Sequence, residues 1–321
     1  MATKLSQPRA GVTPRKPAAP KKKKGPGKQW NDKHPELYDN VKRALQALPL
    51  HFKSNIVVAG IGATDVFAYN TALGTAIEVA VVDTLNAMRN VWDPHLLHQT
   101  YSFVRHSQSF PDVRLEDAAE GSAEPILMGI EVKGWFALSK EAEPSFRYLA
   151  SPSVCQPQDL LMVVPWRFDN VISGSPLLLP VFIEEARHAA EFRNHHWTWV
   201  RGTGAATDQV IPASHQTPYP SKADLCSDKP VKDGGSNFGR IARSGIMKDF
   251  ATKTLNSEAA GIPIKYWIAF LRVFTDGAEP ATVEEEMTKL ARAAAKTLGV
   301  STENKDTAIS YLQMMLRSAD K

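Results

Sequence analysis

The sequence predicts an α/β protein with a mixed central sheet, flanking helices and a helical C-terminal region. Three observations support this fold class. Apolar runs of strand length fall between residues 110 and 183, amphipathic helical patterns precede and follow them, and helical patterns dominate residues 258–318. The composition, 43% hydrophobic and 22% charged, is that of an ordinary globular protein. We expect residues 30–321 to form one domain, with its core at about 70–200.

Residues 1–29 differ from the rest of the chain in charge. They carry nine lysines and arginines and no acid, whereas the remainder has 29 basic and 34 acidic residues. Few large apolar side chains are available there to offset the entropy of ordering, so we expect a disordered basic tail. Its Lys21–Lys24 block suits non-specific phosphate binding, and a solubilising role is the alternative.

Nothing in the sequence points to a membrane or to secretion. No run of about 18 apolar residues is present, and the first residues lack an apolar signal core. Cys155 and Cys226 form neither a disulfide framework nor a paired zinc motif. We therefore expect a cytoplasmic protein with no membrane partner.

The first helix is predicted from Trp30 to Pro49, with an apolar stripe at Leu37, Val41, Leu45 and Leu48. The following Gly60-Ile61-Gly62 lacks the third glycine of a dinucleotide fingerprint, since Asp65 stands there. A tight turn is the better interpretation.

A second amphipathic helix is predicted over Asn70–Val91. Glu78 lies beside its stripe, where it faces either solvent or a neighbouring site. The residues of the stripe are Leu73, Ile77, Val81, Leu85 and Met88.

A hairpin is predicted from two strand-like runs, FPDVRL and ILMGIEVKGWF, around the polar loop EDAAEGSAEP. Glu131 and Lys133 are two residues apart, so they lie on the same face of their strand. The hairpin would bring them next to Asp112. Another Glu-x-Lys, Glu303–Lys305, lies in a polar stretch without strand character.

Two carboxylates beside a lysine on apolar strands suit metal-dependent hydrolysis. Oxygen ligands are those that Mg2+ prefers, so Asp112 and Glu131 could hold one ion. Lys133 could orient a water molecule or stabilise a charged transition state. The alternative is a solvated ion pair on an edge strand, which contributes little stability.

Pro111-Asp112 followed by Glu131-Val132-Lys133 resembles the motif of the PD-(D/E)xK nuclease superfamily, in particular type II restriction endonucleases. The resemblance implies a restriction-endonuclease-like fold and Mg2+-dependent, sequence-specific cleavage of double-stranded DNA that leaves 5′-phosphate ends. It implies metal ligation by Asp112, Glu131 and the Val132 carbonyl, with Lys133 either positioning the attacking water or helping to deprotonate it. Glu78 matches the extra acidic residue that many such enzymes carry on a preceding helix. A palindromic target implies a homodimer.

Beyond the hairpin, Asp159–Pro165 is expected as a central buried strand with Trp166 and Arg167 at its end, and Leu177–Ile183 as another strand. A helix should follow over residues 184–200, with its alanines and Phe192 toward the body, and then a further strand. Arg147 and Tyr148 of the polar connection are candidates to approach substrate. His95 and His98 have metal-ligand spacing but lack a third ligand.

Residues 201–250 are predicted to form loops that contact DNA. Basic side chains gather around flexible glycines, where backbone N–H groups can approach phosphates and arginine can read guanine. Phe238 could pack or intercalate, and an ordinary solvated loop is the alternative. The expected DNA-binding residues are Lys232, Asn237, Arg240, Arg243 and Lys248.

The C-terminal part reads as structural. Ile262–Phe274 is apolar on all sides and should be buried in the core or at a dimer interface, and helices are expected over 283–298 and 306–317. Two other functions remain open: a repair or structure-specific nuclease of the same fold, and a non-catalytic nucleic-acid-binding protein that uses its lysine-rich tail.

Overall fold

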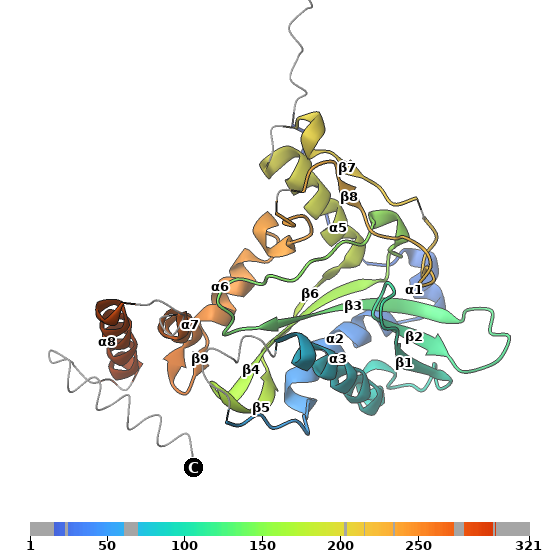
Figure 1. Cartoon of the computed structure of the whole chain (residues 1–321). Helices are drawn as coiled ribbons and strands as arrows, with labels where there is room; N and C mark the ends of the chain where they lie inside the picture. Colours follow the sequence, from blue (N-terminus) through green and yellow to red (C-terminus); the bar gives the residue numbers. More distant parts are fainter. Residues whose placement is uncertain are drawn as a thin grey trace, which may run out of the picture.

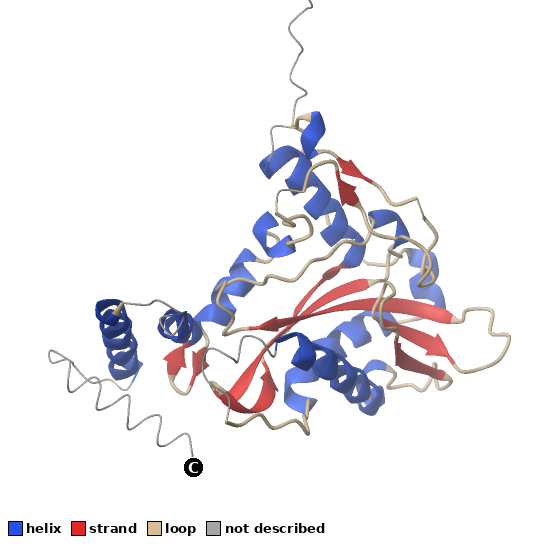
Figure 2. Ribbon diagram, in the orientation of Figure 1, coloured by secondary structure: helices blue, strands red, loops and turns tan. Residues whose placement is uncertain are grey.

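The computed structural model of the chain describes residues 16–22, 25–60, 70–201, 204–214, 216–233, 235–272, 279–297 and 299. A curled mixed β-sheet runs through the middle and helices lie against it (Figure 1), which confirms the predicted α/β class. Figure 2 shows the strands gathered at the centre and the helices around them. Within these residues no helix is both long enough and apolar enough to span a membrane.

The sheet has the order β1-β2-β3-β4-β5, and β6 also pairs with β4. Among the described strands of this sheet, β3 and β4 pair in parallel and the other pairs are antiparallel. The predicted hairpin is confirmed as β2 and β3, and the predicted central strand as β4. The six strands are β1 (Tyr101–Arg105), β2 (Val113–Asp117), β3 (Ile126–Phe136), β4 (Leu160–Asn170), β5 (Ser173–Leu178) and β6 (Phe182–Glu185).

Four strand expectations are corrected. No strand is expected before Phe110, yet β1 forms there. The expected single strand 177–183 is broken at Pro180, which has no N–H to donate to a ladder, so β5 and β6 pair with opposite ends of β4. Trp166 and Arg167 lie within β4 rather than at its end. Among the described residues, no strand of this sheet follows the helix after β6. The later strands form separate pairs, β7 (Val210–Ile211) with β8 (Lys229–Pro230) and β9 (Glu258–Ala259) with β10 (Ile262–Pro263).

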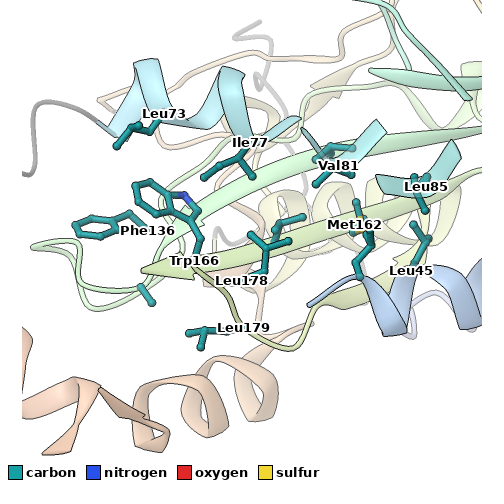
Figure 3. Close-up of a cluster of buried hydrophobic side chains, with 14 of the residues drawn as sticks. Leu45, Leu73, Ile77, Val81, Leu85, Phe136, Met162, Trp166, Leu178 and Leu179 are labelled. Carbon is teal, nitrogen blue, oxygen red and sulfur yellow. The ribbon is translucent and has the colours of Figure 1, made fainter. Parts of the chain in front are cut away.

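One face of the sheet is covered by α2 (Leu37–His51) and α3 (Asn70–Ala87). The apolar stripes that the sequence predicts on both helices are buried. Figure 3 shows the stripe of α3 packed against Phe136, Met162 and Trp166 of the sheet. Their 3.6-residue spacing explains why each helix buries one face. The short helices α1 (Lys28–Lys33) and α4 (Arg89–Trp92) flank them. The single helix predicted from Trp30 to Pro49 is divided into α1 and α2, and α2 continues past Pro49 to His51.

The opposite face is covered by α5 (Ala186–His195) and α6 (Lys248–Asn256). Three fully buried alanines of α5, Ala186, Ala189 and Ala190, pack in one cluster with Leu161 and Val163 of β4. Small side chains allow this helix to lie close to the sheet. Phe192, also expected to face the body, is partly buried. A π-helical segment, His196–Arg201, continues α5.

The C-terminal region is helical, as predicted, in α7 (Ile264–Arg272) and α8 (Pro280–Thr297). Ile264, Trp267, Ile268 and Leu271 are buried while Lys265 is exposed, so α7 buries one face rather than all sides. The expected helix at 306–317 lies outside the described residues.

Part of the N-terminal basic segment lies against the body. Lys22 Nζ is 2.7 Å from Glu184 Oε1, and the Gly25 N–H donates to Glu185 Oε1 at 2.9 Å. His195 Nε2 donates to the Pro17 carbonyl at 3.0 Å. The predicted disorder is therefore wrong for residues 16–22 and 25–29, because the two glutamates before α5 supply partners that the segment itself lacks. Residues 1–15, 23 and 24 lie outside the described part.

Candidate active site

The candidate site forms where β2 leaves the edge of β3. Val113, the first residue of β2, pairs with Ile130, so the next residues of β3 have no β2 partner. Asp112 immediately precedes β2, and its Oδ2 accepts the Val132 backbone N–H at 2.9 Å. A side-chain carboxylate thus takes the place of the missing strand.

Gly129 permits this arrangement. A Cβ added at Gly129 would lie 2.2 Å from Cγ of Pro111, far inside van der Waals contact. Because glycine has no side chain, the Pro111 ring lies directly over β3 and holds the adjacent Asp112 at the strand edge.

Asp112, Glu131 and Lys133 meet, as the sequence predicts. Lys133 Nζ lies 2.8 Å from Glu131 Oε1 and 3.5 Å from Asp112 Oδ2. Glu131 and Lys133 alternate with Val132, which packs into the core cluster on the α2–α3 face. Trp135, two residues on, belongs to the cluster on the α5 face, so Glu131 and Lys133 also project to the α5 face.

The three side chains differ in their access to solvent. Asp112 and Lys133 each keep 20% of their side-chain surface exposed, whereas Glu131 as a residue is 8% exposed. Glu131 Oε2 is buried and has no hydrogen-bond partner among the described residues. An unpartnered buried carboxylate oxygen is costly, and a bound cation would supply the missing partner.

The pKa values of Glu131 and Lys133 are both raised, for different reasons. Burial raises the pKa of Glu131 to about 7; the Lys133 charge opposes this rise and the Asp112 charge adds to it. Burial acts to lower the pKa of Lys133, but Glu131 and Asp112 outweigh it and hold this pKa well above its ordinary value. Lys133 therefore stays protonated, and Glu131 is the group that exchanges a proton near neutral pH.

We predict that the metal-free protein loses stability as the pH rises from about 4.5 to about 7. The folded-state pKa of Glu131 lies above its unfolded value of 4.5, so the native state binds more protons in this window. The stabilisation that protonated Glu131 gives the native state is fully present below pH 4.5 and is lost as the pH rises through 7. Urea denaturation in EDTA at pH 5 and pH 7.5 measures it.

Two variants separate the sources of this pH dependence. Burial also raises the pKa of Asp159 to about 7, with the same sign. Glu131→Gln should remove the contribution of Glu131 to the decrease of the unfolding free energy with pH. Asp159→Asn should remove the contribution of Asp159. A Glu131→Gln protein that keeps the full wild-type slope would contradict the assignment.

Glu78 lies at the margin of the site. Its Oε2 is 3.1 Å from a guanidinium nitrogen of Arg105, the last residue of β1. Burial raises the Glu78 pKa, while Asp112 raises it further and Lys133 lowers it. The expected carboxylate is thus within the electrostatic field of the site, with Arg105 as its direct partner.

Arg105 is the residue that sequence reasoning missed. It pairs with Val113 across β1 and β2, one position from Asp112, and its buried Nε has no hydrogen-bond partner among the described residues. The signal was the short run Tyr101–Arg105, which ends close to the Pro-Asp motif.

Asp112 and Glu131 are the side chains that could hold a metal. Mg2+ is commonly held by one or two carboxylates together with waters and substrate phosphates, so this pair suits it. No group of three or more His, Cys, Asp or Glu side chains converges for metal binding in the part of the chain that the structure describes. His98 instead bonds to Asp93 and His34, and His106 to Glu116.

The expected DNA-contacting residues fall into two groups, exposed lysines and arginines that are paired with glutamates. Lys232 and Lys248 are exposed. Arg240 pairs with Glu141 at 3.0 Å and Arg243 with Glu143 at 2.9 Å. Arg243 also donates to Asn237 Oδ1 at 2.6 Å. These two arginines are therefore held by glutamates about a hundred positions away.

The expectations for Phe238, Tyr148 and Arg147 have different outcomes: Phe238 packs, Tyr148 is withdrawn from any substrate, and Arg147 stays on the surface. Phe238 is fully buried, edge-on to Trp197 with ring centroids 5.2 Å apart, so it cannot intercalate. Tyr148 is also buried, and its hydroxyl donates to the Ala186 carbonyl at 2.9 Å. Arg147 donates to the Phe238 carbonyl and to Asp233. Tyr148 is thus out of reach of a substrate, whereas Arg147, with 37% of its side chain exposed, lies at the surface with Asp233 as its partner.

Comparisons of this chain with protein-family models, with curated proteins and with solved structures gave no match.

Proposed function

We propose that the chain is a Mg2+-dependent endodeoxyribonuclease, similar to type II restriction endonucleases, that hydrolyses double-stranded DNA at specific sequences and leaves 5′-phosphate ends. The observation that carries the proposal is the convergence of Asp112 and Glu131 on Lys133, with one Glu131 oxygen unpartnered. Paired carboxylates with a lysine at an open strand edge suit in-line hydrolysis of a phosphodiester.

Asp112, Glu131 and the Val132 carbonyl are the groups proposed to hold the metal. A bound Mg2+ supplies Lewis acidity and lowers the pKa of an associated water. The raised pKa of Lys133 favours one of its two expected roles. A protonated ammonium donates hydrogen bonds and stabilises developing negative charge, so Lys133 positions the attacking water rather than deprotonating it.

Arg105 extends the proposed site. Its guanidinium lies beside Glu78, next to the strand that follows Asp112. Arginine suits contacts with phosphate oxygens because its planar donors match their geometry. Arg105 is thus proposed to contact a phosphate of the DNA, with Glu78 orienting the guanidinium.

The arrangement of strands supports a restriction-endonuclease-like fold. An antiparallel β1-β2-β3 meander is followed by β4 parallel to β3, and the carboxylates lie where β2 and β3 separate. The connection from β3 to β4 contains only a short 3-10 turn, Pro152–Val154, and the helix α5 comes after β6. The strand expected after this helix is not found among the described strands of the sheet, so the element order differs from the expected one at that point.

The proposed DNA contacts outside the site come from exposed lysines, Lys232 and Lys248, and from Asn237, Arg240 and Arg243. A homodimer is part of the proposal because a palindromic target presents two equivalent half-sites. The overall negative charge of residues 30–321 makes Mg2+ important for binding, since carboxylates and phosphates repel each other.

The test is incubation of supercoiled plasmid and phage DNA with the full chain, with Mg2+ or with EDTA. We expect discrete fragments only with Mg2+, and sequencing of their ends should give one site with 5′-phosphates. A smear would favour the repair or structure-specific nuclease. No cleavage of any DNA under both conditions would contradict catalysis.

The second candidate, a nucleic-acid-binding protein without catalysis, is favoured by the lysine block at residues 21–24. We predict that replacing Lys21, Lys23 and Lys24 with glutamine leaves cleavage within about twofold, because the proposed site lies elsewhere, and weakens DNA binding mainly at low salt. Lys22 stays unchanged because it pairs with Glu184. Cleavage assays and filter binding at two salt concentrations measure both effects. If the wild-type protein does not cleave DNA and the variant loses nearly all affinity for DNA, the protein is a non-catalytic nucleic-acid-binding protein.

A further inference from the structure

A small basic pocket lies at the end of α5, apart from the carboxylate site. It has a volume of about 100 Å³ and none of its lining residues is acidic. It shares no residue with the Asp112–Lys133 cluster. Its charged and polar lining includes Arg193, Trp197, Arg201, Asn237, Arg240 and Arg243.

The arginines of this pocket are not fully neutralised. Arg193 pairs with Asp228 at 2.7 Å, and Arg240 and Arg243 pair with one glutamate each. The guanidinium of Arg201 lies 3.8 Å from the ring centroid of Trp197, and among the described residues no carboxylate pairs with it. Four arginines thus face three carboxylates, which leaves one positive charge.

Two donors near the pocket lack partners. Nε of Arg240 and Nε1 of Trp197 are buried and have no hydrogen-bond partner among the described residues. Trp197 as a residue is only 3% exposed. Buried donors are normally satisfied, so an unsatisfied pair in a basic pocket indicates an acceptor that enters it.

We propose that this pocket binds a terminal phosphate group. A phosphate monoester is close to a dianion at neutral pH and carries three acceptor oxygens, which match the excess charge and the free donors. Arg201 carries the positive charge that no carboxylate among the described residues neutralises. Arg243 is the most exposed of the ion-paired arginines, with 42% of its side chain accessible, so it can reach an entering anion. The pocket has room for several waters or one phosphate-sized anion.

The size of the pocket selects the chemical class. A pocket of about 100 Å³ can take a phosphate at the end of a molecule, while the sugar and base attached to it stay outside. The 5′-phosphate of a DNA strand and that of a mononucleotide share this chemistry. Arg240 and Arg243 would then bind an anion rather than read bases, and this inference does not depend on the nuclease proposal.

The first experiment is calorimetric titration of the full chain with inorganic phosphate in chloride buffer containing EDTA. We expect one phosphate per chain. Arg201→Gln and Arg243→Gln should each weaken binding by about tenfold, because each removes a charged donor. The matched control is Arg292→Gln, which changes an exposed arginine of α8. Phosphate binding is measured in EDTA and without DNA, so its outcome is independent of cleavage, and a failure of this inference is distinguishable from a failure of the nuclease proposal.

Competition identifies the source of the phosphate. A short duplex with 5′-phosphates should displace inorganic phosphate, and the same duplex without them should not. Displacement by dAMP but not by deoxyadenosine would support the same pocket with a nucleotide as its ligand. Circular dichroism checks the fold of each variant, and Arg243→Gln decides the outcome if Arg201→Gln does not fold. Absence of phosphate binding, equal binding by all variants, or equal competition by the unphosphorylated duplex overturns the proposal.

Discussion

Glu131→Gln is expected to lower Mg2+-dependent DNA cleavage by roughly two to three orders of magnitude. Glutamine keeps the shape of the side chain but removes the charge that would hold the cation and that now faces Lys133 at 2.8 Å. The fold should survive, since a neutral amide is easier to bury than a carboxylate whose pKa is already raised to about 7. Single-turnover cleavage at saturating enzyme measures the change.

The matched control for this variant is Glu120→Gln, which changes an exposed glutamate in the loop between β2 and β3. It should cut like the wild type. Asp112→Asn and Lys133→Met should lose activity by a similar factor, because all three side chains act on one phosphate. Cleavage by Glu131→Gln within a fewfold of wild type would remove the site assignment, whatever the other variants do.

Arg193→Met is expected to destabilise the fold by about 3–5 kcal/mol, the largest stability effect that we predict for a single change. Arg193 and Asp228 form an ion pair at 2.7 Å, and their side chains are 3% and 0% exposed. Arg193 also donates to the Tyr148 and Ala150 carbonyls. Methionine fills the space but leaves Asp228 buried without its cation. The free energy of unfolding in urea measures the loss.

A double variant tests the physical reason. Arg193→Met combined with Asp228→Leu should recover part of the lost stability, because it removes both charges together. Arg243→Met, at a half-exposed ion pair, should lose less than about 1 kcal/mol. If Arg193→Met cost no more than Arg243→Met, the buried pair would not be holding α5 to the Tyr148–Ala150 segment.

The spacing of apolar residues was sufficient to place the helices and the central strands. The stripe from Leu73 to Leu85 predicted which face of α3 is buried, and the runs around Glu131 and Leu161 predicted β3 and β4. Such predictions succeed because the period of a helix or strand is a local property of the backbone. Period-two spacing also placed Glu131 and Lys133 on one face, and the short hairpin brought Asp112 to them.

Short or interrupted elements could not be predicted in this way. Five residues of β1 carry too few alternations to be distinguished from a loop, so Arg105 was missed. Pro180 divides what reads as one apolar run into β5 and β6. For β1 the pairing with the neighbouring β2, which is not encoded locally, decides the structure, and for β5 and β6 the proline within the run does.

The amino-acid sequence by itself determined the α/β class, the buried faces of the helices and the carboxylate–lysine cluster, because all three follow from spacing within about 25 residues. Only the tertiary structure decided the environment of those groups. It buried Glu131 enough to raise its pKa and placed Glu141 and Glu143 against Arg240 and Arg243. It also left Arg201 as the positive charge of a pocket. Burial and charge pairing depend on side chains about a hundred positions apart, and those meet only when the whole chain has packed.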